Sequence, residues 1–154
     1  MEYTLFGRTG VYVSPLVLGC MMFGQKTDLA STRKIIDHAI GEGINFLDTA
    51  DVYGKGASEE FVGEALQRNG RRNDVFLATK VNGRMSEAQN AIGNSRLHIV
   101  EGCEASLKRL NTDRIDLYQI HRPTPHIAID ETLRALDDLI SSGKVVYIGT
   151  SNFG

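Results

Sequence analysis

The stretch VFLATKV at residues 75–81 is an apolar run that ends in a lysine, and three other runs along the chain share its design. They are NFLDTADVY at residues 45–53, IDLYQIHRP at residues 115–123 and VVYIGTSNF at residues 145–153. A short apolar run predicts a strand that is buried on both faces of a parallel sheet. Polar residues at the carboxyl ends of such strands indicate the rim where parallel sheets and barrels place their ligand sites.

Amphipathic helical segments separate these runs, so strands are predicted to recur every 30–40 residues, about the length of one βα unit. A further strand is predicted at residues 16–21. The helices are predicted to begin at residues that favour helix starts, namely Thr27 or Asp28, Ser58, Ser95, and Asp130 with Glu131. The last helix is predicted to turn four apolar residues inward: Leu133, Leu136, Leu139 and Ile140.

The fold class follows from the N-terminal third. Residues 3–6 and 11–13 alternate around GRTG, which predicts a β-hairpin. Repeated βα units fit either an open doubly wound sheet or a (β/α)8 barrel. The first βα turn, LGCMMFGQ at residues 18–25, lacks the GxGxxG of dinucleotide-binding open sheets, and a barrel lets the hairpin cover its bottom. We therefore predict one α/β domain over residues 1–154: a hairpin followed by about four and a half units of a (β/α)8 TIM barrel.

Composition narrows the classes of function. A net charge of −2 and a pI near 6.1 argue against nucleic acid as a partner. No apolar stretch is long enough to cross a membrane, and the N-terminus lacks the features of a signal peptide. The two cysteines, Cys20 and Cys103, are expected to stay reduced, which predicts a cytoplasmic protein.

Four polar residues are expected at one barrel mouth: Asp48, Tyr53, Lys80 and His121. A tyrosine hydroxyl, with an ordinary pKa near ~10, transfers protons poorly at neutral pH unless a neighbouring ammonium stabilises its phenolate. A carboxylate can hold that lysine charged, and a histidine can orient a substrate oxygen. The set suits proton transfer to a carbonyl oxygen. It supplies no hydride, so a redox reaction would need a nicotinamide cofactor, and no metal site is predicted.

Each of these residues also has an ordinary structural explanation. Asp48 alone could cap a turn, Tyr53 could pack on a helix, and Lys80 could end a strand in solvent. His121 could be a hydrogen-bonded turn residue, and Asp51 is expected to cap its loop. The coincidence of four such residues at matched positions favours the functional interpretation.

The motifs in this order resemble the aldo-keto reductase family along the whole chain. The matching stretches are FGRTG at 6–10, GINFLDTADVYG at 43–54, ATKV at 78–81, SLKRL at 106–110, RIDLYQIHRP at 114–123 and GKVVYIGTSNF at 143–153. The similarity is to the branch that includes bacterial aldo-keto reductases and the β subunits of voltage-gated potassium channels. In those channel subunits asparagine is typical at the position of His121, so histidine favours a reductase.

The resemblance implies NADPH-dependent reduction of a small aldehyde or ketone. Tyr53 would be the general acid, Lys80 would favour its phenolate, Asp48 would pair with Lys80, and His121 would orient the carbonyl. The cofactor-binding positions would be Cys20, Met21, Gln25 and Asp48, together with Ser151 and Asn152, which match the pair that binds the nicotinamide carboxamide.

In the family, loops beyond residue 154 hold the adenine and the 2′-phosphate of NADPH. The strand at 145–150 is therefore expected at an open sheet edge, which invites pairing with another chain. Two hypotheses follow. The chain is the catalytic half of a reductase, or it is an inactive half-barrel that acts by self-association or by binding a partner, as a channel subunit would.

Overall fold

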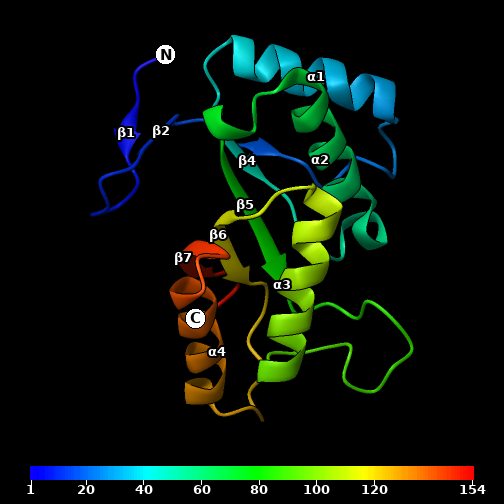
Figure 1. Cartoon of the computed structure of the whole chain (residues 1–154), viewed down its shortest axis with the longest axis vertical. Helices are drawn as coiled ribbons and strands as arrows, with labels where there is room; N and C mark the ends of the chain where they lie inside the picture. Colours follow the sequence, from blue (N-terminus) through cyan, green and yellow to red (C-terminus); the bar gives the residue numbers. More distant parts are fainter.

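The computed structural model describes residues 1–154 as a small antiparallel hairpin and a five-stranded parallel sheet (Figure 1). The parallel strands lie side by side in sequence order: β3 (Leu18–Gly19), β4 (Phe46–Asp48), β5 (Phe76–Val81), β6 (Ile115–Ile120) and β7 (Val145–Thr150). A doubly wound sheet reverses its strand order at a switch point, and this sheet does not. The order is therefore that of a partial barrel, as predicted.

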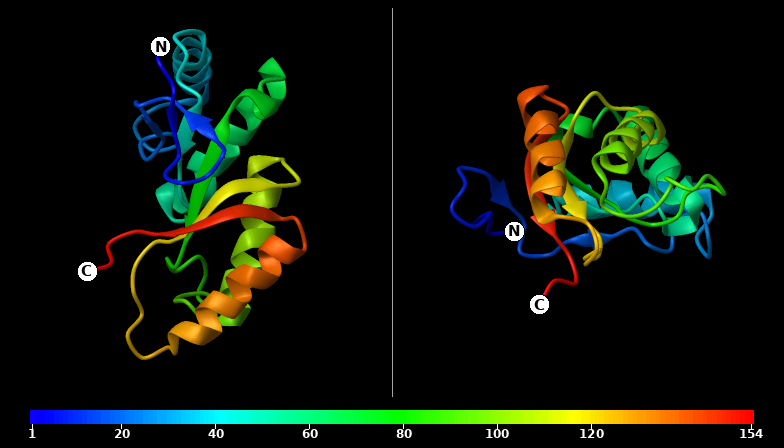
Figure 2. Two further views of the ribbon diagram at one scale, coloured as in Figure 1. Left: turned by 90° about the vertical axis from the view of Figure 1, so that its left-hand side faces the viewer. Right: turned by 90° about the horizontal axis from the view of Figure 1, so that it is seen from below.

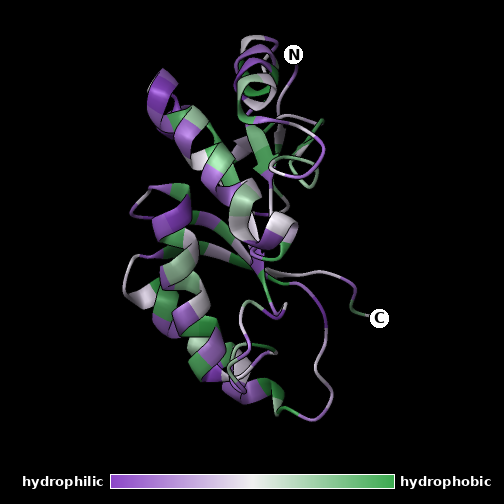
Figure 3. Ribbon diagram, turned by 90° about the vertical axis from the view of Figure 1, so that its right-hand side faces the viewer, coloured by the Kyte–Doolittle hydropathy of each residue, from purple (hydrophilic) through white to green (hydrophobic).

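Four helices cover one side of the sheet (Figure 2). They are α1 (Leu29–Gly41), α2 (Ala57–Asn69), α3 (Arg96–Leu110) and α4 (Ile129–Ser141), with short 3₁₀ turns at η1 (Tyr53–Gly56) and η2 (Arg72–Asp74). The main core lies between the helices and the sheet, and it includes Ile36, Leu66, Leu77, Leu107 and Leu136. Hydrophobic and hydrophilic segments interleave along each helix, as expected of helices that bury one stripe (Figure 3).

Side-chain caps begin two of the helices at the expected residues. The Asp28 carboxylate accepts a hydrogen bond from the Ser31 N–H at 2.7 Å, and Ser95 Oγ accepts one from the His98 N–H at 3.2 Å. The prediction that Ser58 caps α2 is wrong. The cap is Gly56 at φ 98°, and Ser58 faces the sheet, where its hydroxyl donates to the Cys20 carbonyl at 2.7 Å.

The predicted inner face of α4 is only partly correct. Leu136 and Leu139 are buried, but Leu133 is 47% exposed and Ile140 is 37% exposed. Helix α4 packs against β7 and has α3 as its one helical neighbour, whereas α2 and α3 each have a helix on both flanks. The side of α4 that lacks a helical neighbour therefore leaves apolar residues at the surface. The first strand is also shorter than the predicted residues 16–21, because only Leu18–Gly19 pair with β4.

The N-terminal hairpin, β1 (Thr4–Leu5) with β2 (Tyr12–Val13), is confirmed, and its loop closes the face of the sheet opposite the helices. The Phe6 ring lies 5.1 Å from the Phe76 ring and 5.9 Å from the Phe46 ring, measured between centroids. Phe46 and Phe76 are the first residues of β4 and β5. The aromatic cluster therefore fills the amino-terminal end of the barrel interior. The carboxyl ends remain free for a site.

We expect Phe6→Ala to destabilise the chain by about 2 kcal/mol, roughly half the usual cost of removing a fully buried phenylalanine, because Phe6 is only partly buried. Urea unfolding followed by circular dichroism measures this change. Tyr12→Ala, at an exposed position of the same hairpin, is the matched control and should cost less than about 0.5 kcal/mol. Equal stability of both variants would contradict the role of the Phe6 plug.

Candidate active site at the carboxyl ends of the strands

Strand register brings the predicted catalytic residues to one rim. Asp48 pairs in register with Ala78, and Lys80 pairs with Gln119. Alternate residues of a strand point to the same face, so Asp48, Lys80 and Gln119 all face the barrel interior. His121 follows the end of β6, and Tyr53 opens the η1 turn beyond β4.

The centre of the rim is an ion pair between a buried lysine and a partly exposed aspartate. Lys80 Nζ lies 2.5 Å from Asp48 Oδ2 and also donates to the Thr49 carbonyl at 2.9 Å. Gln119 Nε2 donates to the other Asp48 oxygen at 3.0 Å. Lys80 is only 6% exposed, so its charge depends on these partners rather than on water. The network holds the ammonium in a single position.

The Tyr53 ring lies against this pair. Lys80 Nζ is 5.1 Å from the ring centroid, within the range of a cation–π contact. The backbone after Tyr53 enters the left-handed region at Gly54 and Lys55, with φ of 59° and 54°, and this turns the chain sharply into α2. The turn explains how a tyrosine outside the strands reaches back over the rim.

His121 also contacts Tyr53, with the rings edge to face and their centroids 5.7 Å apart. Burial lowers the pKa of His121, and the charges of Lys80 and Arg122 lower it further. The neutral imidazole is therefore favoured, and it carries one N–H donor and one acceptor. A neutral ring can orient a polar oxygen without adding a second positive charge beside Lys80.

Four of the six residues predicted to bind a cofactor fall into two groups. Ser151 and Asn152 follow β7 and join the rim, because Asn152 Nδ2 donates to the His121 carbonyl and to Ser151 Oγ, both at 2.9 Å. Met21 and Gln25 lie on the exposed first loop, where Gln25 Nε2 donates to the Met21 carbonyl at 3.0 Å.

Cys20 differs from both groups because it is wholly buried. Its thiol donates to the Leu18 carbonyl, and burial and the Asp48 charge raise its pKa well above the usual value. Its side chain is not available to a ligand, so Cys20 can act only by supporting the loop that carries Met21. A role of Cys20 at the cofactor stays a prediction.

Sequence reasoning missed Gln119 and did not foresee the burial of Asp51. The alternation rule could have found Gln119, since it lies on β6 two residues before His121, which follows the end of that strand. Asp51 was expected to cap its loop. The Val52 and Asn82 backbone N–H groups lie close enough to favour its charge, but neither carboxylate oxygen makes a hydrogen bond of standard geometry, and the residue is 1% exposed. Burial and the Glu59 charge raise the pKa of Asp51 to about 7.

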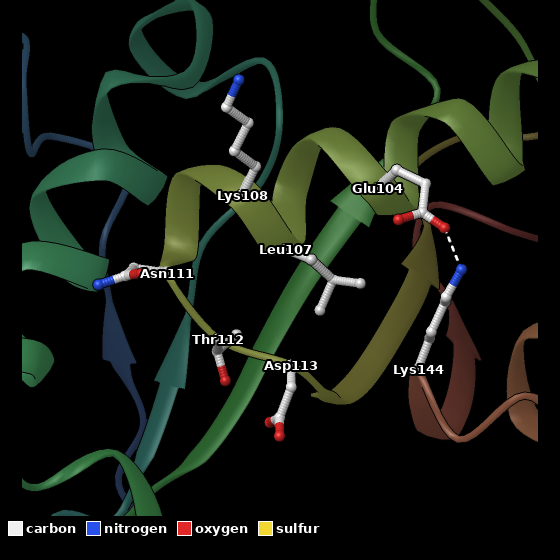
Figure 4. Close-up of a pocket in the computed structure, with 7 residues that line it drawn as sticks. All are labelled: Glu104, Leu107, Lys108, Asn111, Thr112, Asp113 and Lys144. Atoms are coloured by element: carbon white, nitrogen blue, oxygen red, sulfur yellow. Dashed lines mark hydrogen bonds and ion pairs between the residues drawn. The ribbon is translucent and has the colours of Figure 1, made fainter.

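An open pocket of about 620 Å³ lies at the opposite end of the sheet (Figure 4). It is bounded by the end of α3, the segment before β6 and Lys144 before β7, which forms an ion pair with Glu104. In barrels this amino-terminal end serves stability, whereas chemistry takes place at the carboxyl ends. The rim is therefore the better candidate for an active site.

No group of three or more potential metal-ligating side chains occurs in the structure. None of its helices has both the length and the apolar character needed to cross a membrane.

Removing Asp48 should leave the Lys80 ammonium without its carboxylate partner. We expect Asp48→Asn to destabilise the chain by about 3 kcal/mol, and Lys80→Met added to it to recover most of that loss, because the second change removes the uncompensated charge. Urea unfolding of the two single variants and the double variant measures both effects. A double variant no more stable than Asp48→Asn would argue that the pair is not coupled.

Asp51 should make stability depend on pH with a defined sign. Between pH 3.8 and about 7 the folded chain keeps a proton on Asp51 that the unfolded chain has released, so stability should fall as pH rises. We expect Asp51→Asn to remove this decline, with a gain at pH 8 of at most about 4 kcal/mol. Unfolding across this pH range measures it, with Asp137→Asn at an exposed position as control. Parallel pH profiles of wild type and Asp51→Asn would rule out the proton on Asp51.

Comparisons with known proteins agree with this geometry. Residues 15–154 match the Aldo/keto reductase family. Aldo-keto reductase YhdN of Bacillus subtilis (strain 168) is 43% identical over 157 residues, which cover 99% of this chain and 47% of that protein. A probable voltage-gated potassium channel subunit beta of Arabidopsis thaliana is 39% identical over 155 residues, which cover 99% and 47%.

Among solved structures, aldo-keto reductase AKR11C1 from Bacillus halodurans (holo form) is similar with a TM-score of 0.89 and 42% identity, and the match covers 99% of this chain and 51% of that one. The chain spans about half the length of the curated relatives it matches. A sheet in barrel order that matches half of such a structure is a partial (β/α)8 barrel. The family match over nearly all residues and the structural likeness together show that the chain belongs to the aldo/keto reductase family.

Proposed function

We propose that this chain carries the catalytic half of an NADPH-dependent reductase that converts small aldehydes or ketones to alcohols. The observation that supports it most is that the Tyr53 ring contacts both His121 and Lys80, the lysine that is paired with Asp48. A proton donor (Tyr53), a charge that stabilises its conjugate base (Lys80) and an orienting imidazole (His121) thus meet at one rim. Together they can hold a carbonyl oxygen in place and protonate it as the carbonyl is reduced.

In the proposed reaction Tyr53 donates its hydroxyl proton to the carbonyl oxygen as that oxygen becomes an alkoxide. The Lys80 ammonium lies near enough to stabilise the phenolate that remains. Asp48 holds this ammonium in place, and Gln119 donates to the other carboxylate oxygen. The neutral His121 ring donates an N–H to the same oxygen and sets its direction toward Tyr53.

A nicotinamide cofactor, when bound, would supply the hydride for this reduction. The donor and acceptor atoms at the end of β7 suit a carboxamide. Asn152 Nδ2 already donates hydrogen bonds to the His121 carbonyl and to Ser151 Oγ. Asn152 Oδ1 therefore remains as an acceptor for a carboxamide N–H. The Ser151 hydroxyl can donate to a carboxamide oxygen. We infer that Ser151 and Asn152 hold the nicotinamide, and that Met21 and Gln25 contact it from the first loop.

The buried, unpaired state of both cysteines supports a reducing compartment for this protein. We therefore propose that the reductase works in the cytoplasm.

A second candidate is a non-catalytic role as a subunit that binds a partner or a second copy of itself. The likeness to the probable channel subunit of Arabidopsis thaliana favours it. This candidate predicts a defined oligomer that does not turn over aldehydes.

We expect Tyr53→Phe to lower aldehyde turnover by at least about a hundredfold, because the variant keeps the ring but has no proton to donate. Steady-state loss of NADPH absorbance with an aromatic aldehyde measures this change. Binding of NADPH, followed by fluorescence quenching, should be unchanged, since the hydroxyl is not proposed to hold the cofactor.

Tyr12→Phe is the matched control, because it removes a hydroxyl from an exposed position of the hairpin. It should leave turnover at the wild-type level. Undiminished turnover by Tyr53→Phe would refute Tyr53 as the proton donor. Saturable NADPH binding without turnover by the wild type would favour the non-catalytic candidate.

A further inference from the structure

The side chain of Gln119 connects strands that are distant in the chain at the centre of the rim. Gln119 lies on β6, where it pairs in register with Lys80 of β5 on one side and with Gly149 of β7 on the other. Its side-chain nitrogen reaches past Lys80 and donates to Asp48 Oδ1 of β4 at 3.0 Å, across a separation of 71 residues. The side chain therefore spans three neighbouring strands, from β6 over β5 to β4.

The orientation of this amide follows from its partner. A carboxylate that is paired with an ammonium only accepts hydrogen bonds, so the nitrogen of Gln119, and not its oxygen, has to face Asp48. The two Asp48 oxygens then have separate partners, Lys80 at Oδ2 and Gln119 at Oδ1. Without the amide the carboxylate could swing about its last torsion, which has broad energy wells. Gln119 therefore fixes the direction from which Asp48 meets Lys80.

Gln119 fixes the carboxylate without adding a charge to the site. Its amide is neutral, so it satisfies Asp48 Oδ1 and leaves the negative charge of the carboxylate to Lys80. A cationic side chain at position 119 would compete with Lys80 for Asp48, and an anionic one would repel the carboxylate. A neutral donor thus keeps Asp48 paired with the lysine whose ammonium lies 5.1 Å from the Tyr53 ring centroid.

Gly149 leaves the space that the Gln119 side chain occupies. A Cβ atom at Gly149 would lie 3.3 Å from Gln119 Cγ and 3.4 Å from Leu117 Cδ1, which is closer than side chains normally pack. The backbone of Gly149 is outside the left-handed region and pairs regularly with Gln119. Glycine is therefore not needed there for its backbone. A larger residue would press on the stem of Gln119.

We propose that Gln119 is a positioning residue of the proton-transfer site. Its amide fixes the Asp48 carboxylate and, through it, the Lys80 ammonium. Gly149 leaves the room for this arrangement, and the ammonium held in this way is the one that lies against the Tyr53 ring. The consequence for catalysis rests on the proposed reductase function, whereas the position of Lys80 can be measured without turnover.

The first test follows the Lys80 ammonium by proton–nitrogen-15 NMR of the full chain, with Lys80→Met to assign its signal. A buried ammonium held by fixed acceptors exchanges its protons with water slowly. We expect Gln119→Met, which has a side chain of similar length but no N–H donor, to raise this exchange rate at least about threefold, because part of the lost hydrogen bond is felt at the lysine. Gln67→Met, at an exposed position of α2, is the matched control and should leave the rate unchanged.

Two further variants separate positioning from a general loss of stability. Asp48→Ala removes the group through which Gln119 acts, so Gln119→Met added to it should not raise the exchange rate further. Gly149→Ala should press on the Gln119 stem and raise the rate, but not when Gln119→Met is already present. Gly41→Ala, whose new methyl group would meet nothing within 4 Å outside its own helix, is the control and should have no effect. Urea unfolding checks that each variant is folded.

The catalytic consequence is measured as the single-turnover rate of NADPH oxidation with a saturating aromatic aldehyde. We expect Gln119→Met to lower this rate about tenfold, because proton transfer depends on the fixed ammonium. The dissociation constant of NADPH and the aldehyde concentration that gives half the maximal rate should both stay within about twofold of the wild type, since Gln119 is not proposed to bind either ligand.

An exchange rate equal to that of the wild type in a folded Gln119→Met overturns the positioning role. So does an equal effect of Gln119→Met in the presence and absence of the Asp48 carboxylate. Faster exchange with an unchanged single-turnover rate would refute the part that Gln119 plays in proton transfer. A wild-type chain that shows the expected exchange pattern but no turnover would uphold the fixed position of Lys80 and refute the reductase function instead.

Discussion

A lysine ammonium in the interior of a sheet has to be paired, and the arrangement of this protein around Lys80 follows from that need. Asp48 from β4, the Thr49 carbonyl and, through Asp48, Gln119 from β6 surround the charge. A slip of one residue in β5 would send Lys80 to the helix side and leave the Asp48 carboxylate facing an apolar residue. The same contact therefore stabilises the strand register and prepares the rim for chemistry.

The two faces of the sheet have different roles. On the inner face the Phe6 plug closes the amino-terminal end, so the polar residues lie only at the carboxyl end. On the outer face the helices bury a large apolar core that also encloses the Glu59–Arg109 pair. Asp51 belongs to the outer face because it is three residues beyond the inward-facing Asp48. There it lines a small cavity together with His98 of α3, away from the rim.

The end of β7 is tied to the rim by one side chain. Asn152 donates to the His121 carbonyl, so the backbone of the proposed substrate-orienting residue and the proposed nicotinamide-binding pair move together. Asn152 reaches this position through a left-handed backbone, with φ of 59°, which asparagine tolerates better than most residues. Substrate orientation and cofactor position would thus be set by a single local turn.

The sequence alone determined the strands, the hairpin, the barrel class and the four residues of the rim, because strand periodicity and polar strand ends are local properties. Only the tertiary structure decided which residues meet across elements: Ser58 against Cys20 instead of a helix end, Leu133 at a helix flank without a neighbour, and Asp51 with His98 on one cavity. Those outcomes depend on how each helix is rotated and on what packs beside it. Packing between elements distant in the chain sets both, and no local pattern contains that information.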